Sequence, residues 1–182
     1  NEQGGINGRT LVGNYYDAKI LDSATAMQEA CTQVFMMVGQ GWALDSGAEA
    51  IRVGCKMASV PGYTGSSDFA MGPMMVQPIP NPTDYNSIEI AGALAEAFPD
   101  KITKAAVVKS TLPSMIEATE KVLSTYPTQG FQFLDCPQEY QLQGETGWQA
   151  IAQRLKDCGA EMVYFSGSPS PTFQNFLDAA NQ

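Results

Sequence analysis

The chain alternates short apolar runs with longer amphipathic segments along its whole length. The apolar runs predict strands at residues 11–16, 35–38, 56–60, 105–108, 131–134 and 162–165. The segments between them predict helices over residues 23–34, 44–53, 84–98, 113–125, 146–158 and 171–180. Because the strands are too apolar to have a solvent face, this order predicts an α/β fold, with parallel sheets flanked by helices.

Single residues indicate where several of these helices start and stop. Pro113 and Pro171 stand where a first helical turn accepts proline. Thr146 and Gln149 have the spacing of a capping box, and Gly159 is suited to end the same helix. Local helix chemistry therefore agrees with the hydrophobic pattern.

Two breaks suggest a division into lobes. One is the Pro- and Gly-rich passage over residues 62–82, and the other is the turn at residues 99–101. A chain of 182 residues can form one large or two small domains. We place the expected boundary at the second break, which gives a first lobe over residues 1–100 and the beginning of a second lobe over residues 101–182.

Charge and hydropathy exclude several partners. A net charge of −9 would repel nucleic acid phosphates and anionic lipid headgroups, so we expect no nucleic acid partner. No apolar run approaches the roughly 18 residues of a membrane span. Residues 1–5 lack the basic and apolar regions of an export signal, which we therefore expect to lie outside this segment.

Catalytic, metal and cofactor sites have little support. The sequence contains no histidine, which removes Ser-His and Cys-His dyads, and the cysteines have no CxxC spacing for zinc. Gly39 and Gly41 match the start of a dinucleotide motif, but its third glycine would fall at Leu44. Acidic residues such as Asp17 and Glu145 are interpreted as solvated loop or cap groups. We expect a protein that is not an enzyme and has no cofactor or metal.

Four segments together resemble a known family. They are GGINGR at residues 4–9, VGQGW at 38–42, SVPGYT at 59–64 and LKDCGAEMVYFSG at 155–167. In this order they are similar to the branched-chain amino-acid type of solute-binding protein of bacterial ABC transporters. The resemblance implies the two-lobed type 1 periplasmic-binding-protein fold, of which this chain would be an internal portion, incomplete at both ends.

The resemblance implies a first group of ligand-binding residues in the turn of Gly41, Trp42 and Ala43. Relatives hold the ligand's carboxylate there, at the amino end of a helix. Ala43 stands where a serine would supply a hydroxyl, and Asp45 adds a negative charge, so a free α-amino acid is not the expected best ligand. Trp42 could stack on a ring, lie beneath a cation, or pack under the neighbouring lobe.

The second implied group is the turn of Gly62, Tyr63 and Thr64, whose carbonyl and hydroxyl groups contact a ligand ammonium in relatives. Alternatively, the Thr64 hydroxyl caps the following loop. Thr111 and Ser168 stand near the places where relatives supply aromatic side chains from the second lobe. Smaller side chains there imply a different or larger ligand.

The function implied by the resemblance is capture of a small molecule between two lobes and its delivery to the membrane permease of an ABC importer. The protein would work outside the cytoplasm, in the periplasm or at the cell surface, where a lipid anchor preceding this segment is one option. The alternatives are a ligand-sensing domain of a receptor or regulator, and an enzyme whose catalytic residues lie outside this segment.

The cysteines are either buried free thiols or disulfides, and an oxidising location favours disulfides. Cys31 and Cys55 each end a helix that leads into one of two successive strands, so they should lie side by side at one sheet edge. Cys136 follows a strand whereas Cys158 precedes one. Their pairing requires Cys136 to lie on a loop that folds back.

Overall fold

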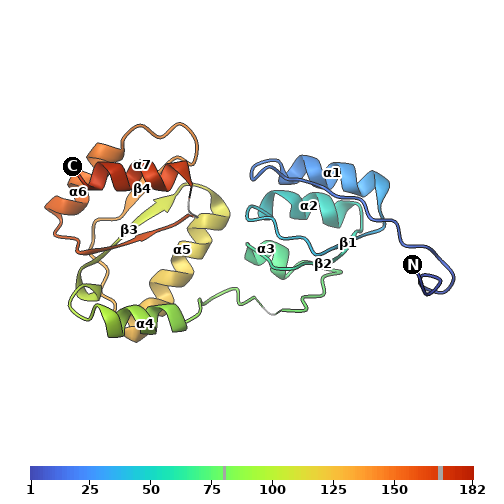
Figure 1. The fold of residues 1–182 in the computed structure, drawn as a ribbon, viewed down its shortest axis with the longest axis horizontal. Helices are drawn as coiled ribbons and strands as arrows, with labels where there is room; N and C mark the ends of the chain where they lie inside the picture. The colour runs from blue at the N-terminus through green and yellow to red at the C-terminus, as the bar shows by residue number, and fades with distance from the viewer. Residues whose placement is uncertain (80, 168–169) are drawn as a thin grey trace. The chain divides into compact units, whose positions relative to one another are not determined.

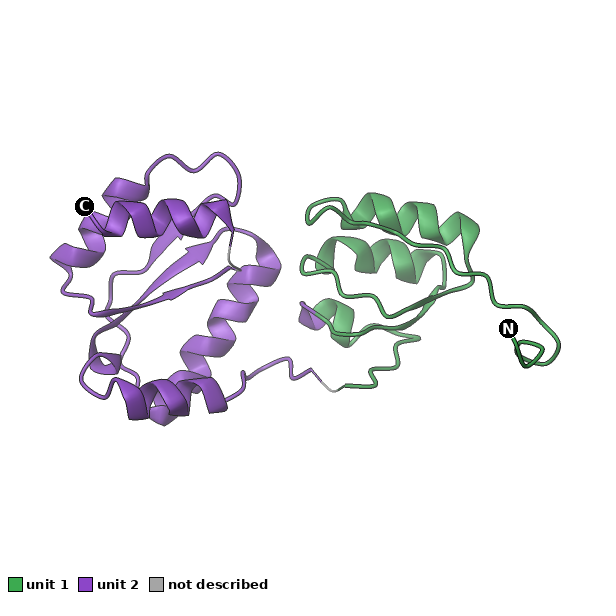
Figure 2. Cartoon of the chain, in the orientation of Figure 1, with its two compact units in different colours: residues 1–64, 68–79 green, residues 65–67, 80–182 purple. Residues whose placement is uncertain are grey.

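A computed structural model describes residues 1–79, 81–167 and 170–182. The chain forms two compact units, which Figure 2 colours separately. Unit 1 comprises residues 1–64 and 68–79, and unit 2 comprises residues 65–67 and 80–182. Each unit has parallel strands flanked by helices, as Figure 1 shows, so the predicted α/β class is confirmed.

Unit 1 is built on two parallel strands. Its elements are α1 Ser23–Gln33, β1 Met36–Val38, α2 Ser46–Gly54, β2 Ala58–Val60 and the short helix α3 Ser67–Ala70 at the unit boundary. In the β1–β2 ladder, Met37 lies opposite Ser59. The core contains Met27, Ala30, Met37, Ala48 and Met57. The helices α1 and α2 therefore cover the face of the sheet that carries Met37.

The strand predicted at residues 11–16 is wrong. Among the described residues, this segment joins no ladder, and its apolar side chains Leu11, Val12 and Tyr15 are exposed. A strand needs a neighbour to accept its backbone hydrogen bonds, and hydrophobic pattern alone does not supply one.

Unit 2 contains a three-stranded parallel sheet in the order β4-β3-β5. Its elements are α4 Glu89–Ala97, the 3₁₀ turn η1 Ile102–Lys104, β3 Ala105–Ser110, α5 Pro113–Thr125, the 3₁₀ turn η2 Tyr126–Gln129, β4 Gln138–Tyr140, α6 Trp148–Asp157, β5 Met162–Phe165 and α7 Pro171–Ala180. Pro113 and Pro171 open their helices as predicted. Residues 105–108 of the central strand β3 are buried on both faces, as their continuous apolar sequence predicts.

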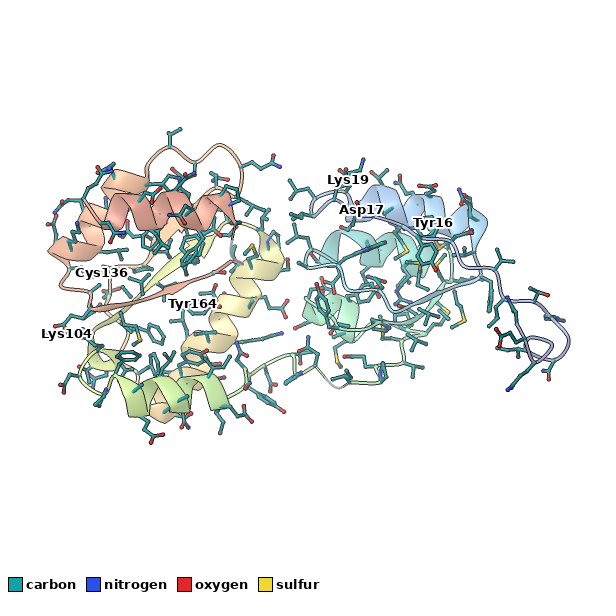
Figure 3. The ribbon with its side chains drawn as sticks, in the orientation of Figure 1. Tyr16, Asp17, Lys19, Lys104, Cys136 and Tyr164 are labelled. Atoms are coloured by element: carbon teal, nitrogen blue, oxygen red, sulfur yellow. A yellow bond between two sulfur atoms is a disulfide. The ribbon has the colours of Figure 1, made fainter. Side chains whose placement is uncertain are left out.

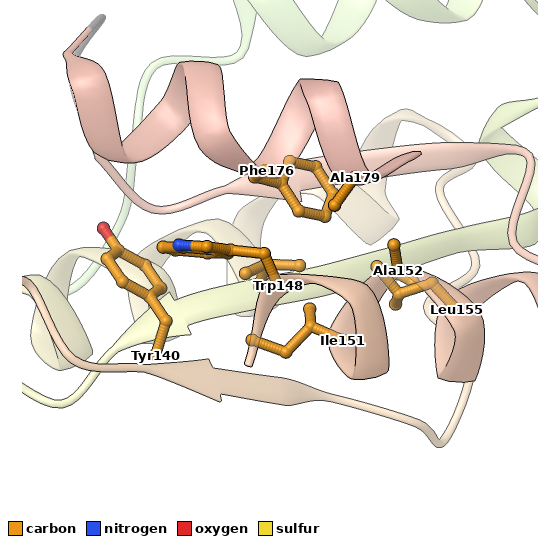
Figure 4. Close-up of a cluster of buried hydrophobic side chains, with 9 residues drawn as sticks. Tyr140, Trp148, Ile151, Ala152, Leu155, Phe176 and Ala179 are labelled. Atoms are coloured by element: carbon orange, nitrogen blue, oxygen red, sulfur yellow. The ribbon is translucent and has the colours of Figure 1, made fainter. Parts of the chain in front are cut away.

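Alternate residues of β3 enter two separate cores. Ala106 and Val108 pack in a cluster with α6 and α7, while Ala105 packs with α4 and α5. In the first cluster, shown in Figure 4, Trp148 lies between Tyr140 and Phe176, with ring centroids 5.4 and 6.3 Å away. Helices on both faces thus exclude water from the sheet.

The division between the units falls earlier than the expected boundary at residues 100 and 101. Helix α4, expected in the first lobe, belongs to unit 2, because Ala91 is fully buried in a cluster with Ile102, Ala105 and Val122. The crossing lies near residues 79 and 80, within the first of the two predicted breaks. The assignment of these units to the lobes of a larger protein stays a prediction.

The strand predicted at residues 131–134 is displaced along the chain. Phe133 makes only an isolated bridge with Ala105, and the ladder with β3 is formed by β4 instead. Pro137, which has no N–H group to donate, stands between the two stretches. The apolar run therefore marks where pairing begins, and the polar residues after it make the strand.

The predicted capping box at the start of α6 is also wrong. The helix begins at Trp148, and Thr146 lies before its N-cap, Gly147. The Glu145 carboxylate accepts hydrogen bonds from the N–H groups of Gln141 at 3.1 Å and Gly147 at 2.6 Å. These bonds lower the pKa of Glu145, which is therefore the group that organises this turn.

All four cysteines are paired, each pair within one unit. Cys31 bonds to Cys55 across a Cα–Cα distance of 5.9 Å, and Cys136 bonds to Cys158 across 6.6 Å. Cys136, labelled in Figure 3, lies in the loop between Phe133 and β4, which returns to the carboxyl end of α6. This is the fold-back that the second pairing requires.

Candidate functional site

The carboxyl ends of β1 and β2 lie side by side and are joined by backbone hydrogen bonds. The Gly39 N–H donates to Val60 O at 2.9 Å, and the Gly62 N–H donates to Gln40 O at 2.7 Å. Gly39 has a φ of +74°, a conformation that favours glycine. The turns after the two strands are therefore held together, at the sheet edge where α/β proteins bind their ligands.

A pocket with a volume of about 300 Å³ opens at this edge of unit 1. One wall is the segment before α1, on which Figure 3 labels Tyr16, Asp17 and Lys19. The opposite wall consists of the two turns. The lining residues are Tyr16, Asp17, Ala18, Lys19, Ile20, Gly41, Trp42, Ala43 and Tyr63. The pocket thus gathers four of the ligand-binding residues expected from the sequence.

Three of the residues that line the pocket are aromatic: Tyr16, Trp42 and Tyr63. Tyr16 and Trp42 are partly buried and pack against the core of unit 1, and the Tyr16 hydroxyl lies 3.2 Å from Gln33 Oε1, to which it donates. Tyr63 is 48% exposed. Its pKa is raised by partial burial and by the negative charge of Asp45. Aromatic rings in a pocket wall can stack on a flat, ring-bearing solute.

Gly41 allows the Tyr63 ring to lie against the first turn. A Cβ atom on Gly41 would lie 2.6 Å from Cε1 of Tyr63, closer than real Cβ atoms approach another atom. The position of the Tyr63 ring therefore depends on a glycine at this site.

We expect Gly41→Ala to move the Tyr63 ring and to weaken ligand binding by about tenfold, with a stability cost of about 1 kcal/mol because the exposed ring can rotate away. Calorimetric titration and thermal melting of the full-length protein measure the two effects. Gly54→Ala is the matched control, since a Cβ there meets nothing within 4 Å. Equal affinities for wild type and Gly41→Ala would show that Tyr63 does not contact the ligand.

Sequence reasoning missed the wall formed by residues 16–20. The Asp17 carboxylate accepts the N–H of Lys19 at 2.9 Å. Lys19 and Ile20 have φ values of +43° and +69°, which are uncommon for residues other than glycine. Asp17, expected to be a solvated loop group, thus supports a strained turn at the pocket. An Asp that bonds the N–H two residues on is a known turn former, but here the apolar run just before it favoured a strand.

Buried Asp45 sets the electrostatics of the same edge. It is 1% exposed and occupies the N-cap of α2, directly after the turn that lines the pocket. A helix amino end ordinarily favours an anion. Here the protein's own carboxylate stands at that end, so a second negative charge from a ligand would be opposed.

Gly62 and Thr64, two other expected ligand-binding residues, do not line the pocket. Gly62 links the two turns through its N–H group. Thr64 is buried, and its hydroxyl donates to Gln77 Oε1 at 3.4 Å. This bond is of the kind that the alternative interpretation of Thr64, a loop cap, requires.

In unit 2, Thr111 directly follows β3, and its hydroxyl donates to Gln141 Oε1 at 3.0 Å. Gln141 follows β4, so the two side chains meet at the carboxyl edge of this sheet. The sequence did not indicate Gln141, because β4 itself was predicted elsewhere. Ser168, the remaining expected ligand contact, lies outside the described residues.

Across residues 1–79, 81–167 and 170–182, no group of three or more acidic or cysteine side chains could hold a metal ion. None of the helices in those ranges is long and apolar enough to cross a membrane.

Comparison with solved structures identifies the fold. A periplasmic binding protein from Burkholderia mallei matches 98% of this chain with a TM-score of 0.67 and 13% identity. An extracellular ligand-binding receptor from Verminephrobacter eiseniae matches 99% with a TM-score of 0.60 and 16% identity. An ABC-transporter solute-binding protein from Rhodopseudomonas palustris, in complex with p-hydroxybenzoic acid, matches 97% with a TM-score of 0.59 and 16% identity.

This chain spans about half of each of these structures, namely 48%, 52% and 50% of their lengths. No protein-family model matches the sequence, and no curated protein matches it. The likeness confirms the expected type 1 periplasmic-binding-protein fold, seen in solute-binding proteins of bacterial ABC transporters.

Proposed function

We propose that this chain is part of an extracytoplasmic solute-binding protein that captures a small molecule between two lobes and delivers it to an ABC importer. The observation that carries the proposal is the aromatic pocket at the joined carboxyl ends of β1 and β2. The likeness to solute-binding proteins supports it. Two intramolecular disulfides support a location outside the cytoplasm.

The proposed ligand is a small solute that carries a ring. Trp42 and Tyr63 offer aromatic surface from the two turns, and Tyr16 offers it from the opposite wall. The Rhodopseudomonas palustris protein binds such a molecule, p-hydroxybenzoic acid. A branched-chain amino acid fits this turn less well. Ala43 has no hydroxyl to offer the carboxylate of such a ligand, and the negative charge of buried Asp45 opposes that carboxylate.

Thermal-shift screening of the full-length protein against amino acids, aromatic acids, amides and polyols tests this function. A ligand at 100 times its dissociation constant stabilises the folded state by about 2.7 kcal/mol, which such a screen detects. Uptake of the labelled ligand by cells with and without the gene then tests delivery to an importer. A screen without any stabilising solute would count against the proposal.

We expect Trp42→Ala to weaken binding of the best solute by about tenfold, because a lost aromatic contact costs about 0.5–1.5 kcal/mol beyond the buried area. Titration calorimetry measures the change. Tyr85→Ala is the control, since Tyr85 is an exposed aromatic residue of unit 2 that does not line the pocket. A Trp42→Ala protein that melts early but binds normally would place this tryptophan in the core only.

A further inference from the structure

The pocket of unit 1 is lined from both walls by aromatic rings, those of Tyr16, Trp42 and Tyr63. The face of an aromatic ring carries partial negative charge and attracts a cation within about 6 Å of the ring centroid. A sphere of about 300 Å³ has a radius of about 4 Å, so every part of an occupant lies close to a wall. A cation bound in this pocket would therefore have aromatic rings within reach.

A carboxylate on the pocket wall is held in place by its own turn. Asp17 lines the pocket, and its Oδ1 accepts the N–H of Lys19 at 2.9 Å. A backbone N–H carries no net charge, so this bond fixes the position of the carboxylate without neutralising it. Among the described residues, no lysine or arginine forms an ion pair with Asp17. The wall thus presents a fixed negative charge.

A second carboxylate acts on the pocket from within unit 1. Asp45 is 1% exposed and stands two residues after Ala43, which lines the pocket. Partial burial and the negative charge of Asp45 raise the pKa of Tyr63, so the field of Asp45 is felt at a lining residue. Salt screens a buried charge less than an exposed one. Asp45 therefore adds to the attraction for a cation.

The positive group of the lining is, by contrast, not fixed. Lys19 is exposed, and its ammonium forms no ion pair among the described residues. A lysine ammonium is strongly hydrated and sits on a flexible four-carbon stem, so it can stay in solvent when the pocket fills. An acidic solute would have to order this side chain and also approach Asp45. The charges that the fold holds in place at the pocket are therefore negative.

We propose that the ring-bearing solute of this pocket carries a positive charge, as an aromatic ammonium compound. This inference rests on the proposed binding function and narrows its ligand class. The ammonium group is held by the aromatic faces and by the carboxylates of Asp17 and Asp45. The competing class is a ring-bearing acid, such as the p-hydroxybenzoic acid in the Rhodopseudomonas palustris protein, with Lys19 as its anchor.

The test uses tyramine, tyrosol and 4-hydroxyphenylacetate as probes, because they share one phenol ring and end in a cationic, a neutral and an anionic group. Titration calorimetry of the full-length protein measures each affinity. We expect tyramine to bind about 5- to 30-fold more tightly than tyrosol, and 4-hydroxyphenylacetate to bind more weakly than either. Added salt should weaken tyramine binding and leave tyrosol binding unchanged.

Charge-only variants separate the two classes. Asp17→Asn keeps an oxygen that accepts the Lys19 N–H, and it should weaken tyramine binding by about 2- to 5-fold while sparing tyrosol binding. Glu29→Gln is the matched control, since it removes the same charge from an exposed position of α1 that does not line the pocket. Lys19→Met should leave tyramine binding unchanged or strengthen it.

Four results would overturn the proposal. They are tighter binding of 4-hydroxyphenylacetate than of tyramine, equal affinities for tyramine and tyrosol, an Asp17→Asn effect no larger than that of Glu29→Gln, and a neutral or acidic solute as the best ligand in a thermal-shift screen extended to aromatic amines. Loss of 4-hydroxyphenylacetate binding in Lys19→Met would establish the competing class. All of these results leave the binding function standing, which fails only if no solute in the extended screen binds.

Discussion

An Arg52→Met substitution is expected to destabilise unit 1 by about 3–5 kcal/mol, because it leaves a buried carboxylate without its partner. Arg52 is fully buried, at 0% exposure. Its Nε and Nη2 atoms donate to the two carboxylate oxygens of Glu49 at 2.8 and 2.7 Å. This paired geometry is the strong form of an arginine–carboxylate interaction.

The same guanidinium joins three segments of unit 1. Nη1 donates to Met57 O at 2.6 Å, just before β2, and Nη2 donates to Pro73 O at 2.8 Å. The group also lies 5.4 Å from the ring centroid of Phe69 in α3. Loss of the side chain would therefore release two carbonyl groups as well as Glu49.

Denaturant unfolding of the full-length protein measures the effect. The double variant Glu49→Gln with Arg52→Met should lose clearly less stability than Arg52→Met alone, since it leaves no buried charge behind. Arg9→Met, at an exposed arginine, is the control and should change little. If Arg52→Met unfolds at the same denaturant concentration as the control, the buried ion pair does not hold unit 1 together.

The parts of the fold that could be predicted depend on local chemistry. Pro113 and Pro171 open helices because proline fits a first turn. Residues 105–108 become a central strand because both faces are apolar. Residues 11–16 are also largely apolar, but strand pairing is a tertiary property and no partner lies beside them among the described residues. Pattern alone could not separate the two cases.

The candidate site, too, could be predicted only in part. A resemblance in two short turns indicated four pocket residues, and the structure gathers them in one pocket: Gly41, Trp42, Ala43 and Tyr63. Gln40 stands in one of those turns, and the sequence did not indicate that its side chain is buried without a hydrogen-bond partner among the described residues. Such burial follows from how distant segments pack, which no spacing of residues along the sequence displays.

Removal of either disulfide is expected to cost about 3 kcal/mol in the chain-entropy model, because each bond closes a loop of moderate length in the unfolded chain. The bonded cysteines are 24 residues apart in unit 1 and 22 apart in unit 2. Cys158 is the C-cap of α6, and Cys136 precedes β4. The second bond therefore ties together two elements of the largest aromatic core.

Paired serine substitutions test each bond without leaving a lone thiol. Cys31→Ser with Cys55→Ser should destabilise the unit that carries the pocket and lower the apparent ligand affinity only when that unit begins to unfold. Cys136→Ser with Cys158→Ser should destabilise unit 2. Thermal melting in oxidising and reducing buffer measures both effects. Reduction should bring wild type to the stability of the variant in which all four cysteines are replaced by serine.

Recovery of all four cysteines as free thiols, in non-reducing peptide mapping of protein taken from its native compartment, would contradict the expected bonds. It would also count against a function outside the cytoplasm, because disulfides form and persist in oxidising compartments.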